Sequence, residues 1–388
     1  MIPLSTIARM PRSPIRAIFE KAIQMDDVVF FSLGEPDFDT PPRVIDAAVE
    51  SLRRGETHYT PNGGLLPLRE AVADSLRAYD GVAYDPADEI AVTSGGMEGL
   101  LLALMTVVEP GDEVILPDPS YTNYRDQILI CKGVPVYVPV REENGFQFDP
   151  ADLKRAITSK TRAVMLNTPA NPTGGVASRA LLEQIAAIAV ENNLFVLFDE
   201  VYKHLYYGAE PFFNIAAVPG MRERTLVIDS CSKTYAMTGW RVGWIAGPAG
   251  VVGCVPKLQE NVCSCVPAFV QRGAICALRT AAADVERMNE AYRARRDCIV
   301  RGINAIPDLS ARTPEGAFYL FVNIRQTGLT SEAFASRLLE EAHVALSPGS
   351  AFGPSGEGYV RISYASSIDV LNEGVRRIAA FMEKLRAR

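Results

Sequence analysis

The first two-thirds of the chain alternates between short apolar runs and longer segments with helical periodicity. Apolar runs rich in β-branched residues are bounded by turn residues, which is typical of buried strands. Because strands that alternate with helices form parallel sheets, the pattern predicts an α/β domain with a mainly parallel sheet. The six predicted strands are residues 89–94, 112–117, 162–167, 194–199, 225–230 and 241–247.

Helical periodicity fills several of the intervals between these runs. Residues 97–108 predict one helix, which Pro110-Gly111 closes, and residues 181–191 predict another. A further helix is expected before the first strand, with Thr40 as its N-cap, Pro41 at its first position and Gly55 beyond its end.

The pattern changes near residue 280. A long charged helix is expected at 284–304, followed by a strand-rich stretch at 316–324, a helix, and a last strand at 359–365. This order indicates a smaller α+β domain. We therefore expect an N-terminal arm that forms part of the small domain, a large domain and a small C-terminal domain, at residues 1–42, 43–280 and 281–388.

Composition narrows the class of protein. The chain has 388 residues, of which 48% are hydrophobic, so it can bury a large core. Its net charge is −7 and it has no run of Lys and Arg, so nucleic acid is not an expected partner. Seven irregularly spaced cysteines suit a reducing compartment. The opening residues lack the apolar core of a secretory signal and no apolar stretch could span a bilayer, so a cytoplasmic location is expected.

Polar residues gather where the predicted strands end. In an open parallel sheet, ligands bind beyond the carboxyl ends of the strands. Each feature alone has an ordinary structural explanation, such as a tight turn or a helix cap, but together they predict one polar pocket with a phosphate cradle, an amide, a carboxylate, a phenol and an amine. These residues are Ser94-Gly95-Gly96, Asn171, Asp199, Tyr202, Ser230 and Lys233.

Such a pocket suits a phosphorylated aromatic aldehyde. An amine can form a Schiff base with the aldehyde, provided that desolvation or nearby cations keep it unprotonated. A buried carboxylate would keep a ring nitrogen protonated, which makes the ring an electron sink. No metal site is expected, because Cys263 and Cys265 have no second pair near them at zinc-ligand spacing; we expect them to pack as buried apolar residues.

At these residues the chain resembles the class I and II aminotransferases, which are pyridoxal-phosphate enzymes of fold type I. The segment SCSKTYAMTGWRVGW (230–244) is similar to their cofactor-binding segment. The resemblance implies that Lys233 is the Schiff-base lysine and general base, and that Ser230 and Arg241 bind the phosphate of pyridoxal 5′-phosphate. It also implies the family fold, in which a mainly parallel seven-stranded sheet lies between helices and a smaller α+β domain is added.

Four further segments resemble the family in the same order, so the resemblance covers nearly the whole chain. SGGMEGL looks like the phosphate loop, PDPSYTNY like the segment whose aromatic ring stacks on the cofactor, NTPANPTGG like the N-P-T-G motif, and FDEVYKHL like D-E-x-Y. They imply cofactor contacts for Gly95, Gly96, Met97, Tyr121, Asn171, Asp199 and Tyr202. Some relatives carry Trp or Phe in place of Tyr121, and others carry Lys, Thr or Ala in place of Met97.

The remaining resemblances concern the substrate and a partner subunit. HYTPNGGLLPLRE implies that Tyr59 reaches the phosphate of a partner subunit, and therefore a homodimer with shared active sites. The resemblance of FSLGEPDFDTP implies that Gly34 lies beside the substrate, and that of NTPANPTGG implies the same for Asn171. The resemblance of YVRISYA implies that Arg361 binds the α-carboxylate of the substrate. A surface ion pair is the ordinary alternative for Arg361, but an arginine in an apolar strand needs an anionic partner.

The expected function is a ping-pong exchange of an amino group between an L-amino acid and a 2-oxo acid. The nearest alternative is a pyridoxal-phosphate lyase that breaks a carbon–sulfur bond or carries out β-elimination with the same lysine and arginine. Ser230-x-x-Lys233 also matches the motif of penicillin-binding acyl hydrolases, but the companions S-D-N and K-T-G are absent. A ligand-sensing regulator of the same fold would need a DNA-binding module, for which there is no room before Pro36.

The sequence leaves the substrate side chain open. A dicarboxylate would need a second cation near the pocket, whereas an aromatic or aliphatic side chain would need apolar lining from Ile15, Ile18 and Phe19 and from the partner subunit.

Overall fold

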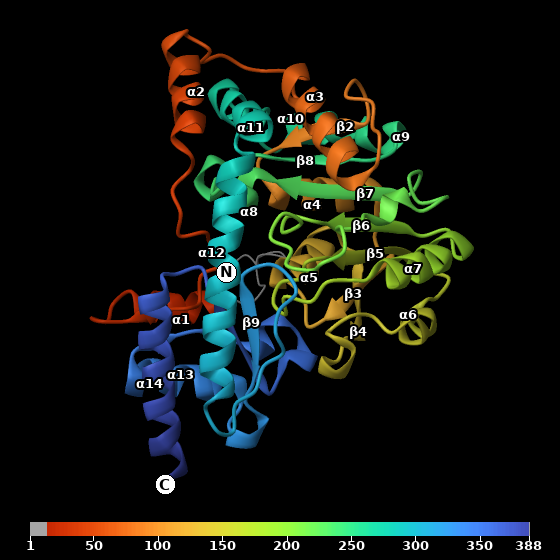
Figure 1. Ribbon diagram of the computed structural model, residues 1–388. Helices are drawn as coiled ribbons and strands as arrows, with labels where there is room; N and C mark the ends of the chain where they lie inside the picture. The colour runs from red at the N-terminus through yellow and green to blue at the C-terminus, as the bar shows by residue number, and fades with distance from the viewer. Residues whose placement is uncertain (1–13, 388) are drawn as a thin grey trace, which may run out of the picture.

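A seven-stranded sheet forms the centre of the molecule in the computed structural model, which describes residues 14–387 (Figure 1). Its strands follow the order β2-β8-β7-β6-β5-β3-β4, and all are parallel except β8, which runs antiparallel to β2 and β7. The expected α/β architecture is confirmed. The strands are β2 (Ile90–Thr93), β3 (Glu113–Asp118), β4 (Val134–Pro139), β5 (Thr161–Asn167), β6 (Phe195–Asp199), β7 (Thr225–Ser230) and β8 (Gly243–Ala246).

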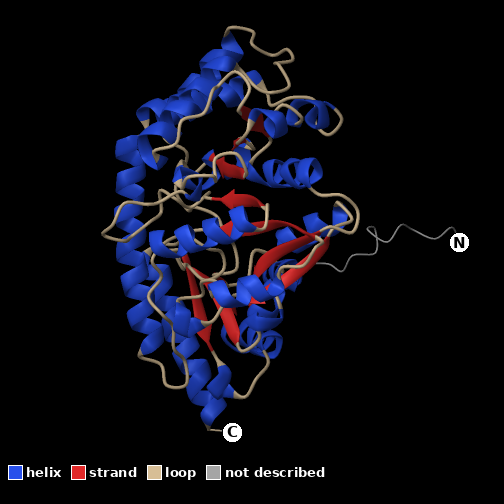
Figure 2. Cartoon of the chain, turned by 90° about the vertical axis from the view of Figure 1, so that its right-hand side faces the viewer, coloured by secondary structure: helices blue, strands red, loops and turns tan. Residues whose placement is uncertain are grey.

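Helices cover both faces of this sheet (Figure 2). Side chains that alternate along the strands pack on opposite layers: Val227 contacts the cluster of α2, α3 and α11, whereas Ile228 contacts that of α4 and α5. The helices up to α11 are α1 (Pro14–Ala22), α2 (Pro42–Arg53), α3 (Leu66–Ser75), α4 (Gly96–Val107), α5 (Thr122–Ile130), α6 (Pro150–Ala156), α7 (Arg179–Glu191), α8 (Cys231–Thr234), α9 (Ala249–Val252), α10 (Val255–Glu260) and α11 (Ala268–Thr280).

The C-terminal part packs mainly around one hydrophobic cluster, which Tyr202, Leu205 and Tyr207 also join. A three-stranded antiparallel sheet, β11-β12-β9, packs with α12, α13 and α14, and β1 from the N-terminal region pairs in parallel with β10. These elements are α12 (Ala282–Asn304), α13 (Ser331–Ala342), α14 (Ile368–Arg386), β1 (Val29–Phe30), β9 (Tyr319–Asn323), β10 (Val344–Ala345), β11 (Ser347–Pro348) and β12 (Tyr359–Ser363).

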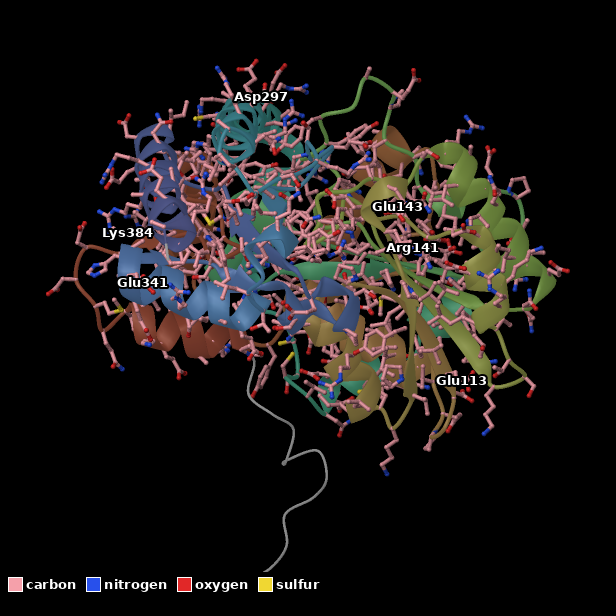
Figure 3. The ribbon with its side chains drawn as sticks, turned by 90° about the horizontal axis from the view of Figure 1, so that it is seen from below. Glu113, Arg141, Glu143, Asp297, Glu341 and Lys384 are labelled. Atoms are coloured by element: carbon pink, nitrogen blue, oxygen red, sulfur yellow. The ribbon has the colours of Figure 1, made fainter. Side chains whose placement is uncertain are left out.

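Helix α12 runs alongside both parts of the molecule (Figure 1). Met288, Tyr292, Ile299 and Ile303 recur at four- and seven-residue spacing and are buried, so one face of the helix joins the core. The outer faces of this helix and its neighbours are charged: Asp297 on α12, Glu341 on α13 and Lys384 on α14 lie at the surface (Figure 3).

Short helical segments complete the described chain. One is a π-helical turn, η2 (Leu76–Asp80), which extends α3. The others are the 3-10 helices η3 (Glu142–Asn144), η4 (Ile215–Ala217), η5 (Thr238–Trp240), η6 (Arg325–Thr327), η7 (Gly349–Phe352) and η8 (Pro354–Gly356).

Two local expectations were wrong, and one strand of the central sheet was not predicted. The helix expected from Pro41 begins at Pro42 with Pro41 as its cap, because the Thr40 hydroxyl donates instead to the carbonyl of Ala236 at 2.6 Å. Strand β4 was missed, because prolines interrupt its pattern, which an edge strand tolerates. Cys263 is exposed rather than buried.

The expectation of no secretory signal concerns residues 1–13, which lie outside the described residues. Between residues 14 and 387, no helix is both long and apolar enough to cross a membrane.

Candidate active site

A cavity of about 550 Å³ opens at the carboxyl ends of β5, β6 and β7. The C-terminal part contributes to its wall through β9 and β12, and α1 contributes Ile15 and Phe19. Most of the residues predicted from the sequence line this one cavity. They are Gly34, Gly96, Met97, Tyr121, Asn171, Asp199, Tyr202, Ser230, Lys233, Arg241 and Arg361.

Lys233 lies on the short helix α8, directly after β7. The hydroxyl of Ser230 caps this helix by accepting from the backbone N–H of Ser232 at 3.3 Å. Lys233 Nζ donates to the carbonyl oxygen of Gly34 at 2.5 Å. Burial lowers the pKa of Lys233 to about 8; Glu35 partly opposes this effect, and the guanidinium group of Arg361 adds to it. The amine therefore loses its proton far more readily than an exposed lysine does.

Asp199 ends β6 and its carboxylate is buried. Its Oδ2 accepts a hydrogen bond from the Tyr124 hydroxyl at 2.6 Å, and its Oδ1 accepts one from the backbone N–H of Val201 at 3.2 Å. Burial raises the pKa of Asp199 to about 6, and the bond from Tyr124 limits the rise. Sequence reasoning missed Tyr124, although it lies three residues after Tyr121, the N-cap residue of α5, and the two rings pack edge to face with centroids 5.5 Å apart.

Asn167 ties the ends of β5 and β6 together and was also missed. Its side-chain amide donates to the carbonyl of Asp199 at 3.0 Å, and its oxygen accepts from the backbone N–H of Asn171 at 2.8 Å. This pair of bonds holds Asn171 beside Asp199. The signal was present in the sequence, because Asn167 opens the NTPANPTGG segment.

Arg361 is a buried cation with incomplete partners. It is 4% exposed, and its guanidinium donates to Asn171 Oδ1 at 2.9 Å, to the carbonyl of Ser32 at 2.6 Å and to Ser347 Oγ at 3.3 Å. Its Nε has no hydrogen-bond partner, and no carboxylate among residues 14–387 forms an ion pair with it. The surface ion pair considered as an alternative is therefore wrong. A buried guanidinium of this kind suits an incoming anion.

Two phenols meet at the wall of the cavity. The hydroxyls of Tyr202 and Tyr319 lie 2.7 Å apart, and the ring of Tyr319 lies under the guanidinium of Arg361, 4.5 Å from it. Gly34 packs on Tyr319 so closely that an added Cβ would overlap its hydroxyl, so glycine is required there. Sequence reasoning did not select Tyr319, because it falls within an apolar strand that predicts only core packing.

The opposite end of the cavity suits an anion. Gly95 caps the 12-residue helix α4 with φ of 77°, and the helix N-terminus presents free N–H groups. The Arg241 guanidinium lies against Gly95: it donates to the carbonyl of Thr238 at 2.9 Å and contacts that of Ser94 at 3.4 Å. A helix N-terminus beside a guanidinium is a favourable phosphate site. Gly95 itself is not among the residues that line the cavity.

Tyr59 lies apart from the cavity of its own chain. It is 90% exposed and does not line the pocket formed by the described residues. Sequence reasoning assigned it to the site of a partner subunit, so its place here stays a prediction.

Comparison with known proteins places this geometry in context. The model of the family described as "Aminotransferase class I and II" matches residues 26–378. The chain is 43% identical to an aspartate aminotransferase of Pyrococcus abyssi, over 94% of each chain, and 41% identical to aromatic-amino-acid aminotransferase 2 of Thermococcus litoralis, over 96% of each. The solved structure of an aspartate aminotransferase from Thermus thermophilus with maleate superimposes with a TM-score of 0.94 at 37% identity, covering 98% of this chain and 100% of that one.

Proposed function

The chain belongs to the class I and II aminotransferases, and from this premise we propose which of its residues transfer the amino group. It is a pyridoxal-phosphate-dependent enzyme that exchanges an amino group between an amino acid and a 2-oxo acid. The lyase alternative has no support among the relatives named above, which are aminotransferases.

The chain's own residues fit pyridoxal 5′-phosphate at both ends of the cavity. When bound, this cofactor supplies an aldehyde that condenses with amines and a protonated ring that withdraws electrons from the substrate α-carbon. We assign its phosphate to the backbone of Gly95, Gly96 and Met97 with Ser230 and Arg241. Asp199 pairs with the ring nitrogen, Tyr121 covers the ring face, and Asn171 and Tyr202 hydrogen-bond the ring hydroxyl.

Lys233 has two roles in this proposal. It is the amine that carries the cofactor covalently, and it becomes the base that removes the α-proton once the substrate amine has displaced it. The observation that carries the proposal is its position: a lysine whose pKa is lowered to about 8 lines the same cavity as Arg361, which is buried and has no carboxylate partner in the described part of the chain. Arg361 binds the substrate carboxylate and so orients the α-carbon, with Gly34 and Asn171 beside it.

The assembly and location are further proposals. An almost fully exposed tyrosine supports the assignment of Tyr59 to the phosphate site of a second copy, and hence a homodimer. We divide the chain into residues 43–280 as the large domain and 281–388 as the small one, with 1–42 joining the small domain through β1; residues 1–13 lie outside the structure. The seven free thiols support a cytoplasmic location.

The direct test is chemical trapping. Borohydride reduction of the protein with pyridoxal 5′-phosphate should leave the pyridoxyl group on the peptide that contains Lys233, as measured by mass spectrometry. Lys233→Ala should remove both this label and the transamination of amino donors, whereas the exposed control Lys160→Ala should keep both. Label on another lysine, or near-native turnover by Lys233→Ala, would refute the assignment.

A second measurement separates the lyase reaction. Pyruvate or ammonia released without any 2-oxo acid acceptor would indicate elimination, and strict dependence on the acceptor would indicate transfer. A panel of amino donors with 2-oxoglutarate and pyruvate then identifies the substrate.

A further inference from the structure

A buried ionic cluster lies behind the strand ends that line the cavity. Its centre is Lys203, which is 1% exposed. Lys203 Nζ lies 2.8 Å from Asp80 Oδ2, 2.6 Å from Glu200 Oε1 and 3.3 Å from Asp229 Oδ2. The mechanism above uses none of these four residues.

Stability alone is a poor explanation for this cluster. Three carboxyl groups share one ammonium in a dry environment, and burial raises the pKa of Asp80, Glu200 and Asp229. The buried Oδ1 atom of Asp80 also has no hydrogen-bond partner among the described residues. Because well-packed apolar residues stabilise a core as well as or better than buried ion pairs do, the cluster calls for a further explanation.

The residues adjacent to the cluster in the sequence supply this explanation. Glu200 follows Asp199, Asp229 precedes Ser230, and Lys203 follows Tyr202, so three cluster members are adjacent to residues that line the cavity.

The cluster and the cavity lie on opposite faces of the same strand ends. Along β7, Val227 faces the α3 layer and Ile228 the α4 layer, so alternation places Asp229 on the α3 side and Ser230 on the α4 side. The side chain of Asp199 also lies on the α4 side, since Tyr124, which donates a hydrogen bond to it, packs in the α4 layer. The backbone N–H of Glu200 donates to the carbonyl of Ile228 at 3.0 Å, which extends the pairing of β6 with β7.

We propose that Lys203 is a positioning residue that links the ends of β6 and β7 through Glu200 and Asp229. This inference rests on the proposed function, in which Asp199 holds the ring nitrogen and Ser230 the phosphate. The ring nitrogen and the phosphate belong to one ligand, so the distance between the two strand ends must match the span between these two groups. Lys203 fixes that distance from behind the sheet. Asp80 comes from η2 and supplies charge without joining the two strands.

The test compares two ligands on the full-length chain freed of cofactor. Pyridoxal 5′-phosphate reaches both strand ends, whereas pyridoxal lacks the phosphate. The dissociation constant of each is measured by fluorescence titration before and after Lys203→Met. The phosphate advantage is the ratio of the dissociation constant of pyridoxal to that of pyridoxal 5′-phosphate. This ratio should fall by about tenfold or more in Lys203→Met, because a misplaced strand end weakens the contacts to the phosphate. A variant that is only less stable would bind both ligands more weakly by the same factor, and that result would overturn the proposal.

Two isosteric variants serve where Lys203→Met does not fold. Asp229→Asn leaves Lys203 with two carboxyl groups. It also keeps a side-chain oxygen that can accept the hydrogen bond from the Ser230 backbone N–H, which Asp229 Oδ1 accepts at 2.6 Å in the wild type. It should lower the phosphate advantage as well. Asp80→Asn makes the same chemical change in the same cluster and should leave the advantage as in the wild type. An equal loss in both variants, or no loss in Asp229→Asn, overturns the proposal. A wild-type chain that binds neither ligand would instead refute the proposed function itself.

Discussion

The carboxylate of Asp199 experiences two opposing influences. Burial raises its pKa to about 6, while the hydrogen bond from Tyr124 favours the charged form. The proposed contact with the ring nitrogen requires the charged form, so Tyr124 determines how far into the acid range the site keeps its affinity.

Removing that hydroxyl should move the pH dependence of cofactor binding. The affinity of the cofactor-free protein should fall as the pH drops through the pKa of Asp199, about 6 in the wild type. In Tyr124→Phe this midpoint should rise by about one pH unit, because a hydrogen bond to a charged group is lost. Fluorescence titrations across the pH range measure the midpoint. Tyr137→Phe, a tyrosine outside the cavity, is the control, and an unmoved midpoint in Tyr124→Phe would contradict the role of Tyr124.

Lys233 should reduce the stability of the cofactor-free protein. Its pKa is about 8 in the folded chain and 10.5 for an ordinary lysine, so the folded state releases its proton first as the pH rises. The unfolded state then binds more protons between these values, and stability rises with pH over that window. Lys233→Met should therefore raise the melting temperature below pH 8, and the gain should disappear towards pH 10.5. A gain that does not depend on pH would indicate better packing rather than relief of a buried charge.

Sequence reasoning found the residues that belong to local motifs. Asp199 ends a predicted strand, and Lys233 and Asn171 each follow one within a few positions. Tyr319 could not be found in this way, because its hydroxyl has a partner only when β9 lies beside the loop that carries Tyr202. A residue whose chemistry depends on a contact distant in sequence leaves no local signal.

At the scale of elements, the phosphate end of the site depends on how α4 begins. Gly95 has φ of 77° and ψ of 169°, a conformation that residues with a side chain avoid. A Cβ at this position would lie 2.5 Å from Nη2 of Arg241. The glycine therefore allows both the turn into the helix and the approach of the guanidinium.

Gly95→Ala should weaken cofactor binding beyond its effect on stability. The added methyl group displaces Arg241 from the helix N-terminus, so the dissociation constant of pyridoxal 5′-phosphate should rise by about tenfold or more. Gly55→Ala is a matched control, because Gly55 has a similar φ of 78° and no neighbour within 4 Å of an added Cβ. Both variants should lose stability from backbone strain, measured by thermal unfolding. Equal cofactor affinity in the two would show that Arg241 does not depend on Gly95.

The elements themselves were largely predictable. Strands such as β6 and β7 are continuous apolar runs, which buried parallel strands require, and their polar ends follow from that burial. Strand β4 was not predictable in this way, since an edge strand needs neither a continuous apolar run nor every backbone donor.

At the scale of the whole molecule, the site lies between the central sheet and the C-terminal part. Lys233 follows a strand of the central sheet, whereas Arg361 lies on β12 of the C-terminal part, and both line one cavity. Periodicity predicts that the ends of parallel strands share one edge of a sheet. It does not give the order β2-β8-β7-β6-β5-β3-β4, and it does not place β12 beside the cavity at that edge. The place of Arg361 came from resemblance, because its neighbours Ser32 and Asn171 are far away in the sequence.

Shared active sites can be tested by mixing two defective chains. Lys233→Ala removes the lysine from its own site, whereas Tyr59→Ala damages the site of its partner. A mixed dimer then has one site with both defects and one with neither. After subunit exchange, activity at limiting cofactor should recover to about a quarter of the wild-type value, because about half of the dimers are mixed and each has one intact site.

The control for this experiment pairs Lys233→Ala with Asp199→Ala. Both residues act within their own chain, so every site in that mixture lacks one of them and activity should not recover. Recovery with Tyr59→Ala but not with Asp199→Ala requires that Tyr59 cross to the partner, since a residue that serves its own chain could not restore the other site. If neither mixture recovers although the chains exchange, Tyr59 acts within its own chain and its proposed role in the partner's site is refuted.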